Sequence, residues 1–372
     1  MTNKFNTLYA ITHSLYSGRA RAYLIKNNIP FEERSTGHES FKAEVLPKSK
    51  LPTIPTLVTT DGEVIRDGAA IIEHFEARNG RPCRPTSSRQ AIVSALFDLI
   101  GSEGLLRPAM HYRWNYQQEN KDFIHYHFFH SQRVTPEREA KTQYMMGKMQ
   151  DAAKMWGVSE ESEQLVESLY QDFLMALNRH LSETPYLLGW QPCIGDFGLL
   201  APMYAHLGRD PVPARLMQQQ APRVYRWVER MNRADADMPE FFDPGSGFLS
   251  NDLVPETLLE VLSILAEDLV PETLAAAQVI NQWLDENKPP PRAKVERAYG
   301  FASFELRGHK LSALAQPYRF FMLQVVQDIY AALDSKQRDQ VDSLMAACGL
   351  AQLMDIKLNR RLGREGNLEI WL

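Results

Sequence analysis

Cysteine is scarce in this chain, whose 372 residues contain only Cys83, Cys193 and Cys348. The three lie far apart in the sequence and follow neither a metal-ligand spacing nor the spacing of a disulfide framework. A disulfide-stapled scaffold is therefore excluded. This usage of cysteine is typical of a reducing compartment.

The sequence also lacks long apolar runs and an excess of positive charge. No window approaches the roughly 18 uncharged apolar residues of a membrane span, and the start MTNKFNTLYAITHS has no apolar signal-peptide core. Lys and Arg number 41 against 46 Asp and Glu, a net charge of -5. Because nucleic-acid binding usually needs a dense basic face, we expect a cytoplasmic protein with no nucleic-acid partner and no membrane association.

What the chain does have is enough apolar sequence, 44% of its residues, for a large core divided among two or three domains. The most informative stretch is LPTIPTLVTTDGEVIRDGAAIIEHF, from Leu51 to Phe75. Its β-branched run Thr56–Thr59, the turn Asp61-Gly62 and the run Glu63–Arg66 predict a hairpin. Asp67-Gly68 then opens a segment with helical apolar spacing.

Two further elements are predicted before this hairpin. Thr7–Ile11 is typical of a strand, and Ser14–Asn27 is typical of a helix that starts at Ser14 or Ser17. A second strand, Phe31–Ser35, follows. The predicted order is strand, helix, strand, helix, hairpin and helix.

This order, with Ile54-Pro55 entering the third strand and Asp67 starting the last helix, resembles the thioredoxin-like domain of cytosolic glutathione transferases. The resemblance implies that Pro55 is cis and that the backbone of Ile54 pairs with the cysteinyl unit of glutathione. It also implies that Asp67 holds the γ-glutamyl end. Gly68 stands where the family has serine; a glycine still offers its N–H at a helix start, where an anionic carboxylate is favoured.

The resemblance also places the thiol-activating residue at the start of the first helix. Arg19-Ala20-Arg21 aligns with the Arg-x-Arg that follows the active-site motif in several classes, which puts Ser14 at the catalytic Ser or Cys position and Ser17 three residues later. Neither is cysteine, so chemistry that needs a protein thiolate is disfavoured and a serine-type, bacterial-like enzyme is expected. A plain helix cap is the alternative role for Ser14. The other candidate donors are His13, Tyr16 and Ser17.

One hydroxyl is enough for this activation. Lowering a thiol pKa by about 2 units corresponds to ~2.7 kcal/mol. A single hydrogen bond to a charged acceptor supplies roughly 1.5–3 kcal/mol. Ser14 at a helix N-terminus therefore suffices to stabilise a glutathione thiolate.

An aromatic and basic segment, MHYRWNY, spans Met110 to Tyr116. In the family the first helices of the second domain face the cleft for an apolar electrophile, so the resemblance offers Tyr16, His111, Tyr112 and Trp114 as candidates for that subsite. Ordinary core packing is the alternative for them.

A histidine cluster in IHYHFFH invites a metal interpretation. The helical spacing places His127 and His130 on one face, with His125 nearby. No acid or cysteine completes a ligand set close by, so we expect no metal.

The second domain is expected to be all-helical over residues 88–248, after a thioredoxin-like domain over 1–80 and the Pro-, Gly- and Ser-rich linker Asn79–Ser88. Tyr186–Tyr204 resembles the buried helix start of the family's helical domain. Cys193 stands at its capping position and Asp196 completes the box.

The chain continues past the usual end of that family, with an additional mainly helical extension over residues 251–372. DLVPETL occurs twice, at Asp252–Leu258 and Asp268–Leu274, which predicts two consecutive helix starts on a solvated acidic pair. Helices are predicted at Pro317–Leu333 and Ser335–Gly349. The alternating segments Phe301–Leu306 and Asn367–Leu372 are expected to pair as an antiparallel ribbon.

Two functional hypotheses follow from the resemblance. The first is a homodimeric, cytoplasmic glutathione transferase in which the co-substrate glutathione attacks a small apolar electrophile, a detoxification chemistry. The second is a non-catalytic protein of the same fold that uses the cleft or the extension for binding. Ser14 and Asp67 favour the first hypothesis, whereas Gly68 and the extension keep the second open.

Overall fold

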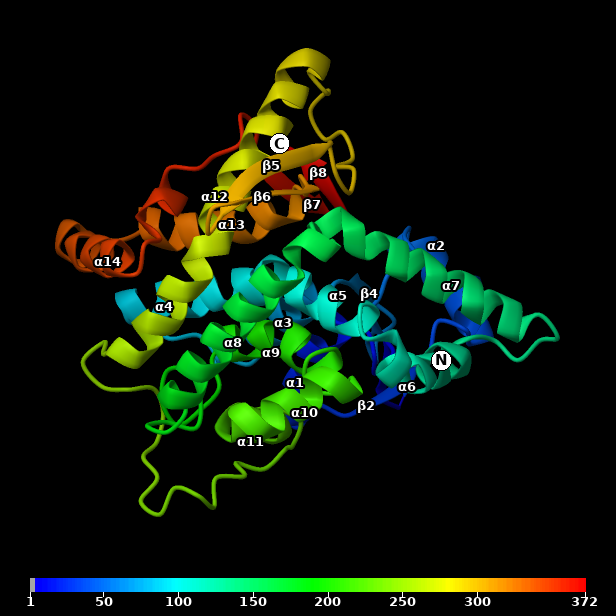
Figure 1. Ribbon diagram of the computed structural model, residues 1–372, viewed down its shortest axis with the longest axis horizontal. Helices are drawn as coiled ribbons and strands as arrows, with labels where there is room; N and C mark the ends of the chain where they lie inside the picture. The colour runs from blue at the N-terminus through cyan, green and yellow to red at the C-terminus, as the bar shows by residue number, and fades with distance from the viewer. Residues whose placement is uncertain (1–3) are drawn as a thin grey trace.

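The computed structural model describes residues 4–372 as a small sheet with flanking helices, a helical region, and a C-terminal region of helices and two hairpins (Figure 1). The helices are α1 Ser17–Lys26, α2 Leu46–Ser49, α3 Gly68–Arg78, α4 Ser88–Leu99, α5 Leu106–Trp114, α6 Gln117–Ser131, α7 Arg138–Ala153, α8 Glu163–His180, α9 Ile194–Ala205, α10 Pro211–Gln220, α11 Pro222–Met231, α12 Glu256–Asn287, α13 Tyr318–Ala331 and α14 Ser335–Ala347. The strands are β1 Asn6–Tyr9, β2 Phe31–Arg34, β3 Thr56–Val58, β4 Val64–Arg66, β5 Phe301–Leu306, β6 His309–Leu314, β7 Leu362–Glu365 and β8 Leu368–Trp371.

The N-terminal sheet has the strand order β2-β1-β3-β4, in which β1 and β2 are parallel and the other pairs antiparallel. Its register aligns Leu8 with Leu57 and Leu57 with Ile65, so three apolar side chains cross the sheet side by side. Leu24 of α1 and Ile71 of α3 complete this buried cluster. The expected element order and thioredoxin-like fold of this region are confirmed.

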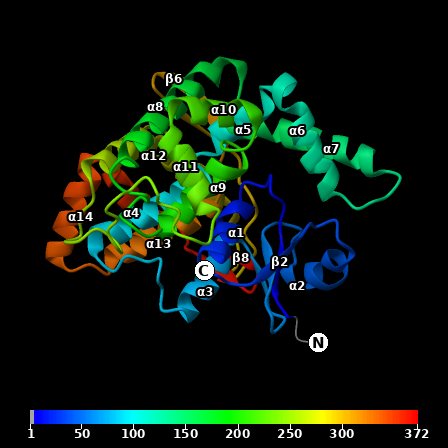
Figure 2. The same cartoon turned by 90° about the horizontal axis from the view of Figure 1, so that it is seen from below.

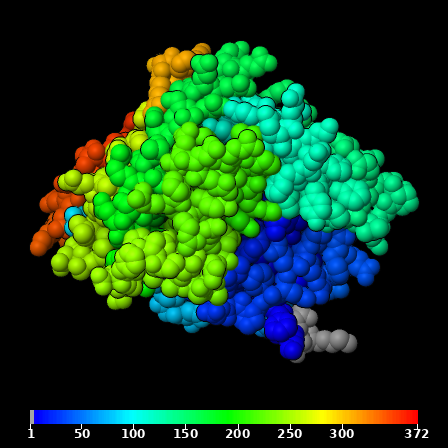
Figure 3. All heavy atoms as spheres, turned by 60° about the horizontal axis from the view of Figure 1, so that its bottom comes forward, coloured from blue at the N-terminus to red at the C-terminus, as the bar shows by residue number. Residues whose placement is uncertain are grey.

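The helical region is built on a close contact between α4 and α9. Gly198 of α9 meets the backbone of Asp98, where an added Cβ would lie 2.5 Å from the Asp98 Cα atom, so only glycine fits. The expected capping box at the start of α9 is present, because Asp196 Oδ2 accepts the Cys193 N–H at 2.9 Å. Figure 3 shows the green surface of the helical region directly against the blue surface of the N-terminal residues.

The C-terminal region packs on both of the others. Helix α12 lies along α8, and α13 and α14 lie on α4. The last strands, β7 and β8, reach the N-terminal sheet, and Figure 2 shows β8 and the C-terminus beside α3. The expected fold class, with a mainly helical extension, is therefore confirmed. Of the described residues, 4–372, no helix is long and apolar enough to cross a membrane.

The prediction of two acidic helices is wrong. A single helix, α12, runs through both DLVPETL copies, with the first copy at its start and Pro271 of the second inside it. Asp268 and Glu272 of the second copy are buried. Both form ion pairs with Arg107, and Glu272 also pairs with Arg319. Tertiary ion pairs thus override the helix-start signal of the repeated sequence.

The expected ribbon is also wrong in its pairing. Phe301–Leu306 is a strand, but its partner is β6, joined to it by the turn Arg307-Gly308. The terminal strand β8 pairs with β7 across the turn at Gly366. Two local hairpins form in place of the expected pairing between Phe301–Leu306 and Asn367–Leu372, because short loops close at low entropic cost.

Alanine in place of Asp268 should lower the free energy of unfolding by about 3 kcal/mol, because it leaves the buried Arg107 guanidinium with less compensation. Urea denaturation measures this change. The matched control on the same helix is Glu260→Ala, which removes an exposed ion pair with Arg179 and should cost less than about 1 kcal/mol. Equal losses in the two variants would contradict the buried-network interpretation.

Candidate functional site

Ser14 lies in the turn between β1 and α1. The helix begins at Ser17, preceded by Tyr16, and Ser14 is not its cap. Instead, the Ser14 N–H donates to the Ile11 carbonyl at 3.0 Å, and the Ser14 carbonyl accepts the Ser17 N–H at 3.2 Å. The half-buried Ser14 side chain therefore serves no helix-capping purpose, and the alternative role as a plain cap is wrong.

The proline turn and the start of α3 form one unit. The Ile54-Pro55 peptide bond is cis, as expected. The Pro55 carbonyl accepts the Asp67 N–H at 3.0 Å, which holds the turn against the residue that precedes α3. Asp67 has a φ of 86°, an uncommon value for a residue with a side chain, and its Oδ1 atom accepts the Ala69 N–H at 3.3 Å.

The extension supplies the remaining partners of Asp67. Its Oδ2 atom accepts the Tyr318 hydroxyl at 2.8 Å and lies 2.7 Å from Arg364 Nη2. Burial alone would raise the pKa of Asp67, but the charges of Arg364 and Arg19 outweigh it and hold this pKa below its usual range. Asp67 is therefore an ionised carboxylate that residues from α13 and β7 already neutralise.

The turn between β7 and β8 also binds the edge strand β4. Asn367 Oδ1 accepts the Arg66 N–H at 2.8 Å, and Asn367 Nδ2 donates to the Val64 carbonyl at 2.9 Å. Arg66 forms two hydrogen bonds with Glu369, at 2.7 and 2.6 Å. These contacts fix the hairpin beside Asp67 through the exposed edge of the sheet.

Arg19 explains why glycine occupies position 68. The side chain of Arg19 is buried, pairs with Asp98 and donates to Ser102 Oγ at 2.7 Å. A Cβ atom at Gly68 would lie 2.7 Å from Arg19 Cγ and 2.8 Å from its Cδ. These atoms are in the middle of a side chain whose end is held, so they cannot easily move aside.

The other candidate donors have different surroundings. His13 is buried against Phe128, and burial, then the charge of Arg113, lowers its pKa well below the usual value, so the ring is neutral. Burial, and next the nearby Glu103, raises the pKa of Tyr16. The Ser17 hydroxyl is buried and has no hydrogen-bond partner among residues 4–372.

The aromatic candidates of α5 are core residues. His111, Tyr112 and Trp114 are all buried. His111 Nε2 lies 2.9 Å from Glu167, the Tyr112 ring stacks on Tyr116, and Trp114 contacts Phe128. Trp114 also lines a cavity of about 460 Å³ between α5, α6 and α7.

The histidines of α6 are held by different partners. His125 lies 3.0 Å from Glu139, and His127 lies 3.0 Å from Arg209. No group of three potential metal ligands occurs within the described range, 4–372.

Several residues of this site carry no local sequence signal. Arg364, Tyr318 and Asn367 lie about 250 to 300 positions after Asp67, Arg66 and Val64, their partners. Arg113, within the aromatic segment, donates to the His13 carbonyl at 2.8 Å and so braces the turn that carries Ser14. The alternating segment Asn367–Leu372 predicted a strand, but its pattern does not indicate which residues that strand contacts.

The comparisons agree with this geometry over the first part of the chain. Residues 8–83 match the family model of the glutathione S-transferase N-terminal domain. That match covers the second half of β1, the strands β2 to β4, the proline turn and α1 to α3. The N-terminal region is thus of the glutathione S-transferase type. No curated protein matches the chain.

Solved structures similar to this chain include a glutathione S-transferase from Xanthobacter autotrophicus Py2, with 22% identity, 60% of this chain and 91% of that chain covered, and a TM-score of 0.34. Another, from Methylobacterium radiotolerans JCM 2831 in complex with glutathione sulfonate, has 14% identity, coverages of 68% and 100%, and a TM-score of 0.38. The beta-etherase LigF from Sphingobium sp. strain SYK-6 has 16% identity, coverages of 64% and 97%, and a TM-score of 0.42.

The contact between Gly68 and Arg19 generates a stability prediction. Gly68→Ala and Gly68→Ser should each lower the free energy of unfolding by about 1–3 kcal/mol, because the added Cβ overpacks against the held Arg19 side chain. Thermal or urea unfolding measures this loss. Gly147→Ala is the control: it lies in a helix with open space around it and should stabilise by up to about 1 kcal/mol. A stabilised Gly68→Ala variant would show that Arg19 moves freely.

Proposed function

We propose that the protein is a glutathione transferase whose Ser14 hydroxyl activates the thiol of glutathione. The observation that carries the proposal is the 3.0 Å hydrogen bond from the Asp67 N–H to the Pro55 carbonyl. It joins the proline turn to the N-terminus of α3. This arrangement supports the proposal, because a peptide paired with the backbone before Pro55 would have its charged end near a helix N-terminus.

In this proposal a different residue binds each part of glutathione. The backbone of Ile54 pairs with the cysteinyl unit. Asp67 receives the γ-glutamyl amine, and the Gly68 N–H at the start of α3 receives the carboxylate. The Ser14 hydroxyl donates a hydrogen bond to the sulfur. Since a thiolate accepts a hydrogen bond more strongly than a thiol, the Ser14 contact favours ionisation.

The proposed reaction is a substitution or addition at an electrophilic carbon. The thiol proton passes to solvent, and the thiolate forms a carbon–sulfur bond. In a substitution the leaving group departs with its bonding electron pair; in an addition the π bond of the acceptor breaks and its electron pair takes up a proton from solvent. The proposed electrophile is small and apolar. Of the family-based candidates for its subsite, only Tyr16 is partly exposed, since His111, Tyr112 and Trp114 are packed in the core. Cytoplasmic location and assembly as a homodimer stay predictions.

Ser14→Ala should lower kcat for conjugation of glutathione to an activated chloronitrobenzene by about 10- to 100-fold, which corresponds to loss of a hydrogen bond to a charged sulfur. The glutathione KM should change little. The effect should be largest below pH 7, where fewer thiols ionise without help. Ser17→Ala is the control, and loss of activity in that variant with full activity in Ser14→Ala would reassign the donor.

A second candidate, a non-catalytic protein of this fold, is favoured by one observation. The Asp67 carboxylate already has Arg364 and Tyr318 as partners. A γ-glutamyl amine must therefore compete with a guanidinium that is 2.7 Å away. If this contact is permanent, the extension replaces the ligand.

Arg364→Ala distinguishes the two candidates. For a transferase, removing the competing cation should tighten glutathione binding by about 10-fold, since Asp67 becomes available to the amine. Isothermal titration calorimetry measures the dissociation constant. Arg361→Ala, which removes an exposed pair with Asp328, is the control. Absence of glutathione binding and conjugation in both the parent and Arg364→Ala would support the non-catalytic protein.

A further inference from the structure

The buried side chain of Arg113 connects the helical region to the turn that carries Ser14. Arg113 lies on α5 and is 3% exposed. Its Nη1 atom donates to the carbonyl of His13, the residue before Ser14, at 2.8 Å. Because the acceptor belongs to the main chain, this bond restrains the backbone of the turn itself.

The other donors of Arg113 bind two more segments. Nε and Nη2 donate to the two carboxylate oxygens of Asp210, which precedes α10, at 2.6 and 2.9 Å. Nη2 also donates to the carbonyl of Ala205, the last residue of α9, at 2.8 Å. A guanidinium is planar and rigid, so acceptors on several sides fix both its position and its orientation. The His13 carbonyl therefore meets a donor that the helical region holds in place.

The charge of Arg113 is already compensated. Asp210 is fully buried and accepts two parallel hydrogen bonds from the guanidinium, the geometry of a strong ion pair. The pair as a whole is neutral. Its effect on the turn is therefore one of position rather than of charge.

The turn has local hydrogen bonds that shape it but do not anchor it. The Ser14 N–H donates to the Ile11 carbonyl at 3.0 Å, and the Ser17 N–H donates to the Ser14 carbonyl at 3.2 Å. Both bonds stay within the turn, whereas the bond from Arg113 reaches it from another region of the chain. A catalytic group displaced by about 1 Å loses roughly 100-fold in rate, so this anchor matters for a hydroxyl that must reach a sulfur atom.

We propose that Arg113 is a positioning residue for thiol activation, because through the His13 carbonyl it holds the Ser14 hydroxyl within reach of the glutathione sulfur. The inference rests on the function proposed for Ser14. It adds that α5, α9 and the start of α10 together determine how well that hydroxyl works. Loss of the anchor should leave glutathione binding at Ile54 and Asp67 intact and reduce the ionisation of the bound thiol.

Arg113→Lys in the full chain tests this role. Lysine keeps the positive charge beside Asp210, but one ammonium group cannot reproduce the planar fork that also reaches the His13 carbonyl. We expect kcat for conjugation of glutathione to an activated chloronitrobenzene to fall by about 10-fold or more, with the glutathione KM changed by less than about 2-fold. The pH profile of kcat should shift to higher pH, because the bound thiol ionises less readily. A smaller folded fraction alone would lower kcat equally at every pH.

A double variant provides a second test if Arg113→Lys does not fold. Arg113→Gln combined with Asp210→Asn removes both charges, so that no unpaired charge is buried, and it should give the same kinetic changes. Arg230→Lys is the matched control. Arg230 is also buried, and it binds the Glu240 carboxylate and the carbonyls of two residues outside the turn, Asp237 and Pro185. This control should lower the unfolding temperature without changing kcat or its pH profile.

Hydrogen exchange measured by mass spectrometry separates the inference from the proposed function. The amides of residues 11–17 should exchange faster in both Arg113 variants than in the parent and in Arg230→Lys. Unchanged exchange in this segment, or an unshifted pH profile in a folded Arg113 variant of an active parent, would overturn the inference and leave Ser14 as the donor. A parent that neither binds nor conjugates glutathione would instead overturn the proposed function, and the inference with it.

Discussion

The buried ion pair between Arg19 and Asp98 is the contact on which the rest of the structure depends. It joins α1 of the thioredoxin-like region to α4 of the helical region, and Arg19 also binds Ser102 beyond the end of α4. Neither charge is accessible enough to be solvated, so removing one partner alone would cost several kcal/mol. Because the Arg19 side chain crosses under the start of α3, it excludes any side chain at position 68. One ion pair thus joins the two regions, favours glycine at position 68 and holds a positive charge that lowers the pKa of Asp67.

The C-terminal extension adds further contacts with the helical region and with the N-terminal sheet. It is anchored at a distance from the sheet by the Arg107–Asp268 pair, and it reaches the sheet edge through Asn367 and Glu369. Between these two anchors, Tyr318 and Arg364 meet Asp67. A residue that the resemblance assigns to ligand binding is therefore also a structural contact. The competition between Arg364 and a ligand amine for Asp67 decides which of the two candidate functions applies.

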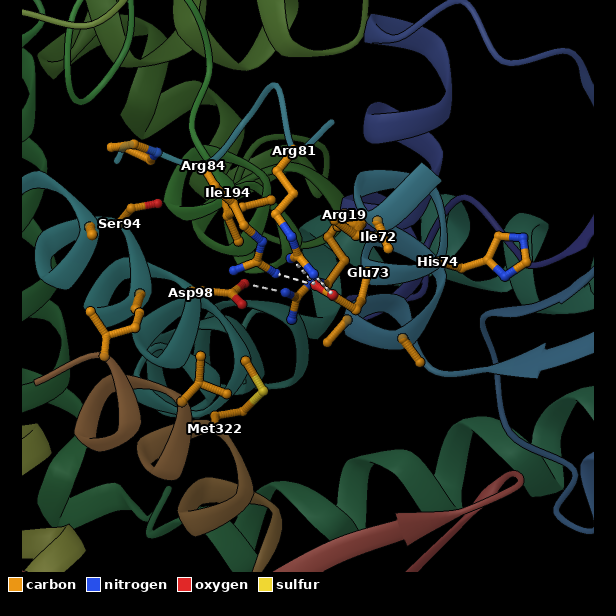
Figure 4. A pocket seen from close by; sticks show the side chains of 18 of the residues that line it. Arg19, Ile72, Glu73, His74, Arg81, Arg84, Ser94, Asp98, Ile194 and Met322 are labelled. Atoms are coloured by element: carbon orange, nitrogen blue, oxygen red, sulfur yellow. Dashed lines mark hydrogen bonds and ion pairs between the residues drawn. The ribbon is translucent and has the colours of Figure 1, made fainter. Parts of the chain in front are cut away.

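The extension shapes the surroundings of α3 both at its start and along its length. Asp67 precedes the helix, whereas Glu73 and Ala77 lie along the face that lines a cleft of about 890 Å³ between α3, α4 and α13 (Figure 4). Arg19 and Arg364 line that cleft and also act on Asp67, because their charges lower its pKa. The surroundings of Asp67 and this cleft therefore share two arginines.

The sequence by itself determined the elements whose causes are local. The β-branched run Thr56–Thr59, the turn at Asp61-Gly62 and the helical spacing after Asp67 all depend on neighbours within a few residues, and the structure has the hairpin and the helix that they predict. The cis bond at Pro55, expected from the family resemblance, is also present. Only the tertiary structure decided that both DLVPETL copies share one helix, that β5 pairs with β6, and that Arg364 neutralises Asp67. These outcomes depend on burial and on charges brought together from distant positions. Periodicity and capping signals hold no information about which distant charge will be buried beside a given residue.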